Sequence, residues 1–193
     1  MRPNVLCIDP LGDNDFGAEI LWEDLPKIDR PMKSGRRYRV SLVRRAGIED
    51  LDIMAAKIFR FILLAAERDS LPKPFTLYVD EADRFGNAYW NDRSLKYLAN
   101  YGRHWDISFI VNARRYAAIP KDWTSQSDVI VMGPSVDIIA DGRIVSGLIG
   151  RERMKQWESL ERYQFIGKGL DGIGYIRYNG YDEDGGYIGY TRF

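Results

Sequence analysis

Short apolar runs that end in polar residues constrain the fold of this chain more than any other feature. They occupy residues 4–8, 38–43, 75–79, 107–111 and 129–132. Runs of this length, bounded by turn-forming residues, are typical of strands buried on both faces of a parallel sheet. Two of them end directly before an acidic residue, at Asp9 and Asp80. The carboxyl ends of parallel strands meet at one edge of a sheet, so we expect these two acids to lie at the same edge.

Segments with helical spacing alternate with these runs. They span residues 50–69, 91–102 and 150–161. Asp50 and either Asn91 or Asp92 are expected to cap the first two helices, and Gly102 to end the second. Strands that alternate with helices predict βαβ units. The expected fold is therefore α/β, with a mainly parallel sheet flanked by helices in three layers.

The segment from residue 164 onward has a different composition, rich in glycine and tyrosine. Residues 164–166 and 174–178, separated by Gly-Leu-Asp-Gly, predict a β-hairpin. We therefore expect a core domain at residues 1–150, followed by a C-terminal helix and β extension at residues 151–193.

Charge and composition limit the classes of protein to which the chain can belong. The 193 residues include 28 basic and 28 acidic side chains and one cysteine, so the overall charge does not indicate a nucleic-acid partner. The chain has no apolar stretch of about 18 residues and no signal-peptide pattern, so we expect a cytoplasmic protein without a membrane span. Locally, Arg36, Arg37 and Arg39 form a basic cluster, which suits either a solvated strand edge or contact with nucleic-acid phosphates.

The most informative segment is the apolar run at residues 75–79, followed by Asp80 and Glu81. Two adjacent carboxylates at the carboxyl end of a parallel strand lie where α/β proteins bind ligands. There Asp80 could hold Mg²⁺ through its water ligands, and Glu81 could polarise a water for attack on a γ-phosphate. Turn chemistry, with Asp80 capping the next segment, is the alternative.

A second signal follows the run at residues 107–111, where Arg114 and Arg115 occur in a polar segment. This strand is expected to neighbour residues 75–79 and to end at the same edge. An arginine there could reach a phosphate of its own site or of a neighbouring subunit. The alternative is that both arginines are solvated loop residues.

These motifs, in this order, resemble the ATPases of the HerA/FtsK group, which includes cellular DNA pumps and viral packaging ATPases. The resemblance covers roughly residues 4–150. It rests on a Walker B-like strand end, a Gly-Arg stretch before a strand, a double arginine, and a Ser-Gln-x-Asp segment entering an apolar run. Their residues are 79–82, 102–107, 114–115 and 125–130.

The resemblance implies a P-loop NTPase-like core that binds ATP and Mg²⁺, with Glu81, Arg114 and Arg115 in catalysis and Asp80 and Asp9 at the nucleotide. It also implies double-stranded DNA as partner, a homo-oligomeric ring, a portal or capsid contact and, for a viral protein, a place in the host cytoplasm or the virion.

One motif of that group is missing. No Gly-x-x-x-x-Gly-Lys-Ser/Thr pattern, the Walker A loop that cradles phosphates, occurs in this sequence. In the group this loop precedes the strand that corresponds to residues 4–8. Three explanations stay open: a fragment of a longer ATPase, a domain that no longer hydrolyses ATP, or a chain to which a partner supplies the loop.

Three functions are therefore compatible with the sequence. The first is an ATPase subunit of a DNA-translocating or DNA-packaging motor, favoured by the retained Asp80–Glu81 pair. The second is a non-catalytic ATPase-like module that binds DNA or partner proteins, favoured by the missing loop. The third is an ATPase relative in phage morphogenesis or secretion.

Overall fold

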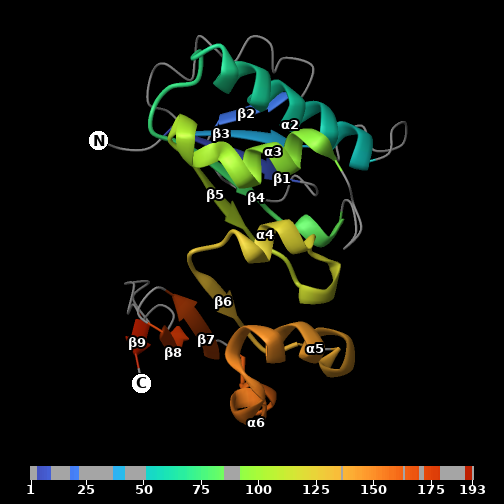
Figure 1. Cartoon of the computed structure of the whole chain (residues 1–193), viewed down its shortest axis with the longest axis vertical. Helices are drawn as coiled ribbons and strands as arrows, with labels where there is room; N and C mark the ends of the chain where they lie inside the picture. The colour runs from blue at the N-terminus through green and yellow to red at the C-terminus, as the bar shows by residue number, and fades with distance from the viewer. Residues whose placement is uncertain are drawn as a thin grey trace. The chain divides into compact units, whose positions relative to one another are not determined.

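The computed structural model divides the chain into two compact units (Figure 1). The first comprises residues 1–114 and 118–123, and the second comprises residues 115–117 and 124–193. The structure describes residues 4–9, 18–21, 37–41, 51–84, 92–135, 137–162, 164–169, 172–178 and 190–192.

The first unit is built on a five-stranded sheet in the order β2-β3-β1-β4-β5, in which every pair of neighbours is parallel. The strands are β1 (Asn4–Asp9), β2 (Ala18–Leu21), β3 (Arg37–Ser41), β4 (Phe75–Val79) and β5 (Ile107–Val111). The predicted α/β class with a mainly parallel sheet is confirmed. β1 and β4, inside the sheet, are buried along most of their length, as expected of such apolar runs. β5, at the edge of the sheet, is not buried on both faces as predicted: its side chains alternate, and Ile110 is 54% exposed.

Two helices cover the sheet face that carries Leu6, Leu77 and Phe109, which lie opposite one another in register. They are α2 (Leu51–Glu67) and α3 (Arg93–Tyr101). Their buried side chains join this face in one hydrophobic core: Met54, Ile58, Phe59 and Ile62 of α2, and Leu95 and Leu98 of α3. Burial of each large apolar side chain contributes about 1.5–3 kcal/mol, so this contact fixes both helices on the sheet.

The ends of α3 show how local sequence sets a helix boundary. Asp92 is the N-cap, because its Oδ1 accepts the Leu95 backbone N–H at 2.7 Å. Gly102 is the C-cap of α3, as predicted, but it keeps right-handed angles, and a 3₁₀ turn follows over Gly102–Trp105. The chain reverses at Asp106, whose φ of 59° is left-handed. Asp106 is therefore the residue that leads the chain into β5.

In its described residues, the second unit combines an antiparallel sheet with helices. The sheet has the order β6-β7-β8-β9, formed by β6 (Ile130–Met132), β7 (Gln164–Gly169), β8 (Gly172–Tyr178) and β9 (Tyr190–Arg192). The helices are α5 (Ile138–Ile149) and α6 (Met154–Glu158). The core contains Met132, Val145, Ile149, Trp157 and Ile166. The predicted hairpin after residue 164 is present as β7 and β8.

The second unit begins earlier than the predicted extension at residues 151–193. β6 lies in this sheet because Met132 pairs with Ile166 of β7, in antiparallel register. α5 belongs to it because Val145 and Ile149 are buried with Trp157. The sequence prediction assigned residues 129–132 to the core domain, because an apolar run alone does not show which strand it pairs with. Where the structure describes the chain, it contains no helix long and apolar enough to span a membrane.

Candidate functional site

The carboxyl ends of β1, β4 and β5 bring three polar residues into a row. The Asp80 N–H donates to the Ile8 carbonyl at 3.0 Å, and the Asn112 N–H donates to the Val79 carbonyl at 2.9 Å. Asp9, at the end of β1, is buried. The parallel register therefore places Asp9, Asp80 and Asn112 side by side, at the edge where α/β sheets bind ligands.

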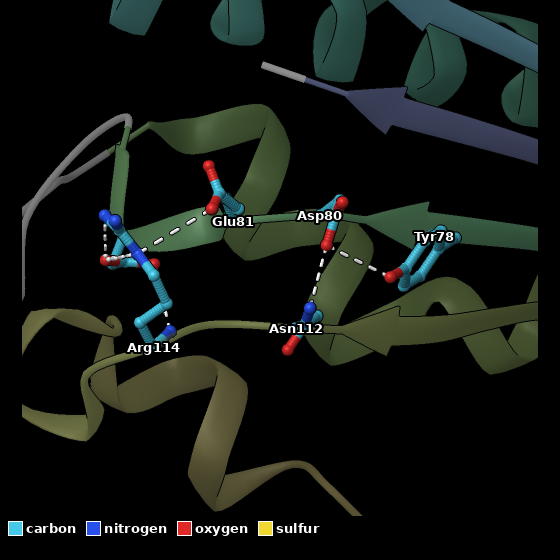
Figure 2. Close-up of polar contacts among 6 residues, drawn as sticks. Tyr78, Asp80, Glu81, Asn112 and Arg114 are labelled. Carbon is cyan, nitrogen blue, oxygen red and sulfur yellow. Dashed lines mark hydrogen bonds and ion pairs between the residues drawn. The ribbon is translucent and has the colours of Figure 1, made fainter. Parts of the chain in front are cut away.

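The Asp80 carboxylate is held by two donors, one from its own strand β4 and one from the end of the neighbouring strand β5 (Figure 2). Its Oδ1 accepts the Asn112 Nδ2–H at 2.8 Å and the Tyr78 hydroxyl at 3.1 Å. Burial raises the pKa of the Tyr78 phenol well above its usual value, and the charge of Asp80 and the hydrogen bond to it raise that pKa further. Tyr78 therefore stays protonated and donates, and Asp80 is a carboxylate of fixed orientation.

Glu81 occupies an unusual backbone conformation directly after Asp80. Its φ is 40°, in the left-handed region that residues with a Cβ adopt at an energetic cost. Its Oε1 lies 3.8 Å from Arg114 Nε, and its side chain is 21% exposed. Backbone strain of this kind is concentrated at functional sites, where it turns a side chain in a required direction. In Figure 2 the Glu81 and Asp80 side chains follow each other at the end of β4.

Arg114 is held in place by Asp83, which lies in the 3₁₀ turn Ala82–Arg84 after β4. Arg114 Nε and Nη2 donate to Asp83 Oδ2 at 3.2 and 2.9 Å, and the Arg114 backbone N–H donates to Oδ1 at 3.1 Å. Burial acts to raise the pKa of Asp83, but the hydrogen bonds and charge of Arg114 outweigh it and hold that pKa below its usual value. This pair joins the segment after β4 to the segment after β5.

Solved structures of viral NTPases share this fold. The genome packaging NTPase B204 from Sulfolobus turreted icosahedral virus 2, in complex with AMPPCP, has a TM-score of 0.68 and 17% identity over 90% of this chain and 82% of that chain. The chain has the fold of a viral genome-packaging NTPase. B204 with ATP-gammaS gives a TM-score of 0.67 and 18% identity, over 90% and 81% of the two chains. B204 of Sulfolobus Turreted Icosahedral Virus, a DNA-packaging ATPase, gives 0.59 and 16%, over 91% and 98%.

By sequence alone, no protein-family model matches this chain, and no curated protein matches it. The fold is therefore recognised from structure, and it agrees with the P-loop NTPase-like core that the sequence motifs predict. In this packaging-NTPase fold, Asp9, Asp80, Glu81 and Arg114 all lie in the first unit at or beside the carboxyl ends of its strands.

Arg115 has different surroundings from Arg114. It belongs to the second unit, where its Nη2 donates to Asp137 Oδ2 at 2.5 Å. Asp137 is also the N-cap of α5, since its Oδ1 accepts the Ala140 N–H at 3.1 Å. Arg115 is thus fixed to the start of α5, and its predicted role at a phosphate stays a prediction.

The predicted basic cluster is only partly described. Arg36 lies outside the described residues, as do the side chains of Arg37 and Arg39. The backbone of Arg37 and Arg39 lies in β3, opposite Val5 and Cys7 of β1. These two positions therefore belong to an internal strand of the sheet, between β2 and β1.

Sequence reasoning did not single out three residues that organise the site: Tyr78, Asp83 and Asn112. Asn112 could have been found, because the last residues of two neighbouring parallel strands lie together and Asn112 follows β5 directly. Tyr78 lies two residues before Asp80, where a side chain points to the same face of the strand. The role of Asp83 could not be predicted from the sequence, because its partner Arg114 lies 31 residues further along the chain.

The oxygen ligands at this edge of the sheet suit a metal ion that binds together with a nucleotide. Within the described ranges, no group of three or more His, Cys, Asp or Glu side chains is arranged to hold a metal ion by itself. Mg²⁺ at nucleotide sites is usually bound by one or two carboxylates together with phosphates and waters. Asp80 offers such a carboxylate, and Asn112 and Tyr78 fix its direction.

Proposed function

We propose that this chain is an ATPase subunit of a viral DNA-packaging or DNA-translocating motor of the HerA/FtsK type. The observation that carries this proposal is the row of Asp9, Asp80 and Asn112 at one sheet edge, with Glu81 next to Asp80. The proposal is supported by the fold shared with B204, whose solved structures contain AMPPCP and ATP-gammaS.

Each side chain at this edge has a role that its chemistry suits. Asp80 would bind the Mg²⁺ that accompanies ATP, through the ion's water ligands, and Asp9 would add negative charge beside it. Glu81 would orient a water towards the γ-phosphate and accept its proton. Arg114, 3.8 Å from Glu81, would stabilise the charge that develops on the transferred phosphoryl group. For Arg115 the proposal keeps the role that the sequence predicts, contact with a phosphate.

The proposed partners follow from the same function. They are double-stranded DNA, further copies of this chain in a ring, and a portal or capsid protein. For a viral protein, this places the chain in the host cytoplasm or in the virion. Light scattering of the purified protein with and without ATP and duplex DNA measures the ring directly, and a monomer under all conditions would contradict that part of the proposal.

A second function is favoured by one observation. The sequence contains no Gly-x-x-x-x-Gly-Lys-Ser/Thr loop, and this loop supplies the backbone N–H groups and lysine that hold the β- and γ-phosphates. A non-catalytic module that binds DNA or partner proteins would need no such loop. The two functions differ in nucleotide binding, which fluorescence of an N-methylanthraniloyl ATP measures.

The deciding experiment is Mg²⁺-dependent phosphate release from ATP, with and without duplex DNA. We expect Glu81→Gln to lower the rate by about 100-fold or more, because the substitution removes the general base but keeps the shape. Glu67→Gln is the matched control, since Glu67 is exposed at the end of α2, and it should leave the rate unchanged.

Hydrolysis that is equal in the wild type and in Glu81→Gln would exclude the proposed role of Glu81. An absence of both hydrolysis and nucleotide binding would assign the chain to the second function.

A further inference from the structure

The outer side of α3 carries a continuous strip of aromatic rings. Tyr97 and Tyr101 are separated by one helical turn, and their ring centroids lie 4.6 Å apart. Trp105 lies 5.9 Å from Tyr97, and His104 stacks on Tyr101 at 6.3 Å with an interplanar angle of 27°. We call these four residues the aromatic strip. It joins the helix to the 3₁₀ turn that follows it.

The two tyrosines of the aromatic strip are exposed, whereas Trp105 is partly buried and packs against the hydrophobic core. Leu95 and Leu98 of the same helix are 2% and 0% exposed and pack against the sheet, whereas Tyr97 and Tyr101 are 45% and 46% exposed. The two tyrosines therefore contribute little to the burial that fixes α3. Large aromatic side chains that remain at the surface, next to one another, mark a place for a ligand or partner.

The charged residues within the segment that carries the aromatic strip are all basic. Residues 93–105 contain Arg93, Lys96 and Arg103 and no acidic residue, although the whole chain has 28 basic and 28 acidic residues. All three basic residues are exposed. Arg93 lies four residues before Tyr97 and so on the same side of the helix. Two carboxylates flank this stretch: Asp92 is the N-cap of α3, and Asp106, after Trp105, is exposed.

Exposed rings flanked by cations on one helix face match the chemistry of a single-stranded nucleic acid. Bases stack on aromatic rings whatever their sequence, and cations beside the rings neutralise the phosphates. From Arg93 to Tyr101 the helix extends about 12 Å, at about 1.5 Å per residue, which is enough for a few stacked nucleotides. A duplex hides its base faces, so the rings would contribute little to binding it.

We propose that the aromatic strip and its three cations bind single-stranded nucleic acid. This inference specifies how the proposed DNA partner would be bound. It rests on the proposed function only because that function leads us to expect a nucleic acid as the ligand. It names a binding surface apart from the carboxylate edge and a strand form that differs from the duplex substrate of a packaging motor. Binding at the strip requires neither ATP nor hydrolysis.

The test is fluorescence anisotropy with a labelled 12-nucleotide oligo-dT, and with a 12-base-pair duplex for comparison, in the absence of nucleotide. We expect tighter binding of the single strand, and a weakening of about tenfold for each ring removed in the variant Tyr97→Ala/Tyr101→Ala. The variant Tyr97→Phe/Tyr101→Phe keeps the rings and should bind like the wild type. Ile53→Ala, at a 52% exposed residue of α2, is the control for surface truncation.

A second measurement isolates the cations. The logarithm of the oligo-dT affinity should fall less steeply with the logarithm of the salt concentration in Arg93→Gln/Arg103→Gln. The slope should decrease by about 0.7 for each phosphate that the variant no longer neutralises. Unchanged affinity in the double-alanine variant would overturn the proposal. So would equal affinity for the duplex, or self-association that the alanine substitutions abolish while oligo-dT binding persists.

These outcomes are separable from those for the proposed ATPase. Glu81→Gln should bind oligo-dT like the wild type, because Glu81 is not part of the strip. Loss of hydrolysis in that variant with intact oligo-dT binding would support both proposals independently. Oligo-dT binding through the strip by a chain that never hydrolyses ATP would support the strip and contradict the ATPase.

Discussion

At the scale of single residues, the pairing of Asp83 with Arg114 connects the segments after β4 and β5. The Asp83 side chain is 4% exposed and accepts three hydrogen bonds from Arg114, two from the guanidinium and one from the backbone. A carboxylate whose pKa is lowered by folding stabilises the folded state at pH values above its unfolded pKa. That stabilisation disappears as the pH falls through the folded pKa.

We therefore expect Asp83→Asn to lower the free energy of unfolding by about 1 kcal/mol at pH 7, because the charge-assisted hydrogen bonds weaken. The difference from the wild type should shrink below pH 3.8, the ordinary pKa of an aspartate, as Asp83 itself becomes protonated. Urea unfolding at pH 7 and at pH 3 measures both quantities. Asp69→Asn is the control, since Asp69 pairs with Lys73 in an exposed position. A difference that is the same at both pH values would contradict the ionic origin.

The left-handed backbone of Glu81 gives a second prediction at this scale. Glu81→Gly and Glu81→Ala both remove the carboxylate, so both should abolish the proposed hydrolysis. They differ because glycine adopts a φ of 40° without the clash that a Cβ makes. We expect Glu81→Gly to be more stable than Glu81→Ala by about 1 kcal/mol, as measured by thermal unfolding. Equal stabilities would mean that the conformation at this position is not strained.

At the scale of elements, α3 depends on its first turn. Asp92 accepts the Leu95 N–H at 2.7 Å and so satisfies one of the backbone donors at the start of the helix. We expect Asp92→Ala to destabilise the protein by about 1 kcal/mol, and Asp92→Ser, which can still accept the bond, to restore most of it. Urea midpoints of the three proteins measure this, and a serine variant no better than alanine would contradict capping.

The helices and strands that could be predicted from the sequence are those whose hydrophobic pattern and end signals lie within a few consecutive residues. β1, β4 and β5 are short apolar runs ending at polar residues, and the parallel register then follows from their alternation with helices. α5 was missed because Gly142 and Gly147 lower its helix propensity. Gly142 has a packing reason: a Cβ there would lie 3.4 Å from Met154 Cε and 3.7 Å from the Trp157 ring. Such contacts exist only after the chain has folded.

The same distinction applies to the candidate site. Asp9, Asp80 and Glu81 could be predicted because strand ends in a parallel sheet share one edge. The partners that orient them could not all be predicted, because the Asp83–Arg114 pair depends on two turns whose conformations the sequence does not specify. Arg115 is adjacent to Arg114 in sequence, yet it pairs with Asp137 in the second unit, and this pairing could not be predicted from its position next to Arg114.

At the scale of the whole molecule, the two units have separate hydrophobic cores that share no residue among those described. The first core includes Phe59, which is fully buried and meets Trp123 edge to face at 6.5 Å. The second includes Trp157, which is 1% exposed and donates its Nε1–H to the Gly133 carbonyl at 3.0 Å. Separate cores predict that each unit loses structure as its own cooperative unit.

We expect Phe59→Ala and Trp157→Ala each to destabilise its own unit by about 3–5 kcal/mol through cavity formation. Hydrogen exchange followed by mass spectrometry locates the effect along the chain. In Trp157→Ala, exchange should rise in β6, β7 and α5 while β1 and β4 keep their protection, and Phe59→Ala should give the opposite pattern. The carboxylate edge lies in the first unit, so Trp157→Ala should also leave nucleotide affinity unchanged. Faster exchange throughout the chain in both variants would show instead that the two cores unfold together.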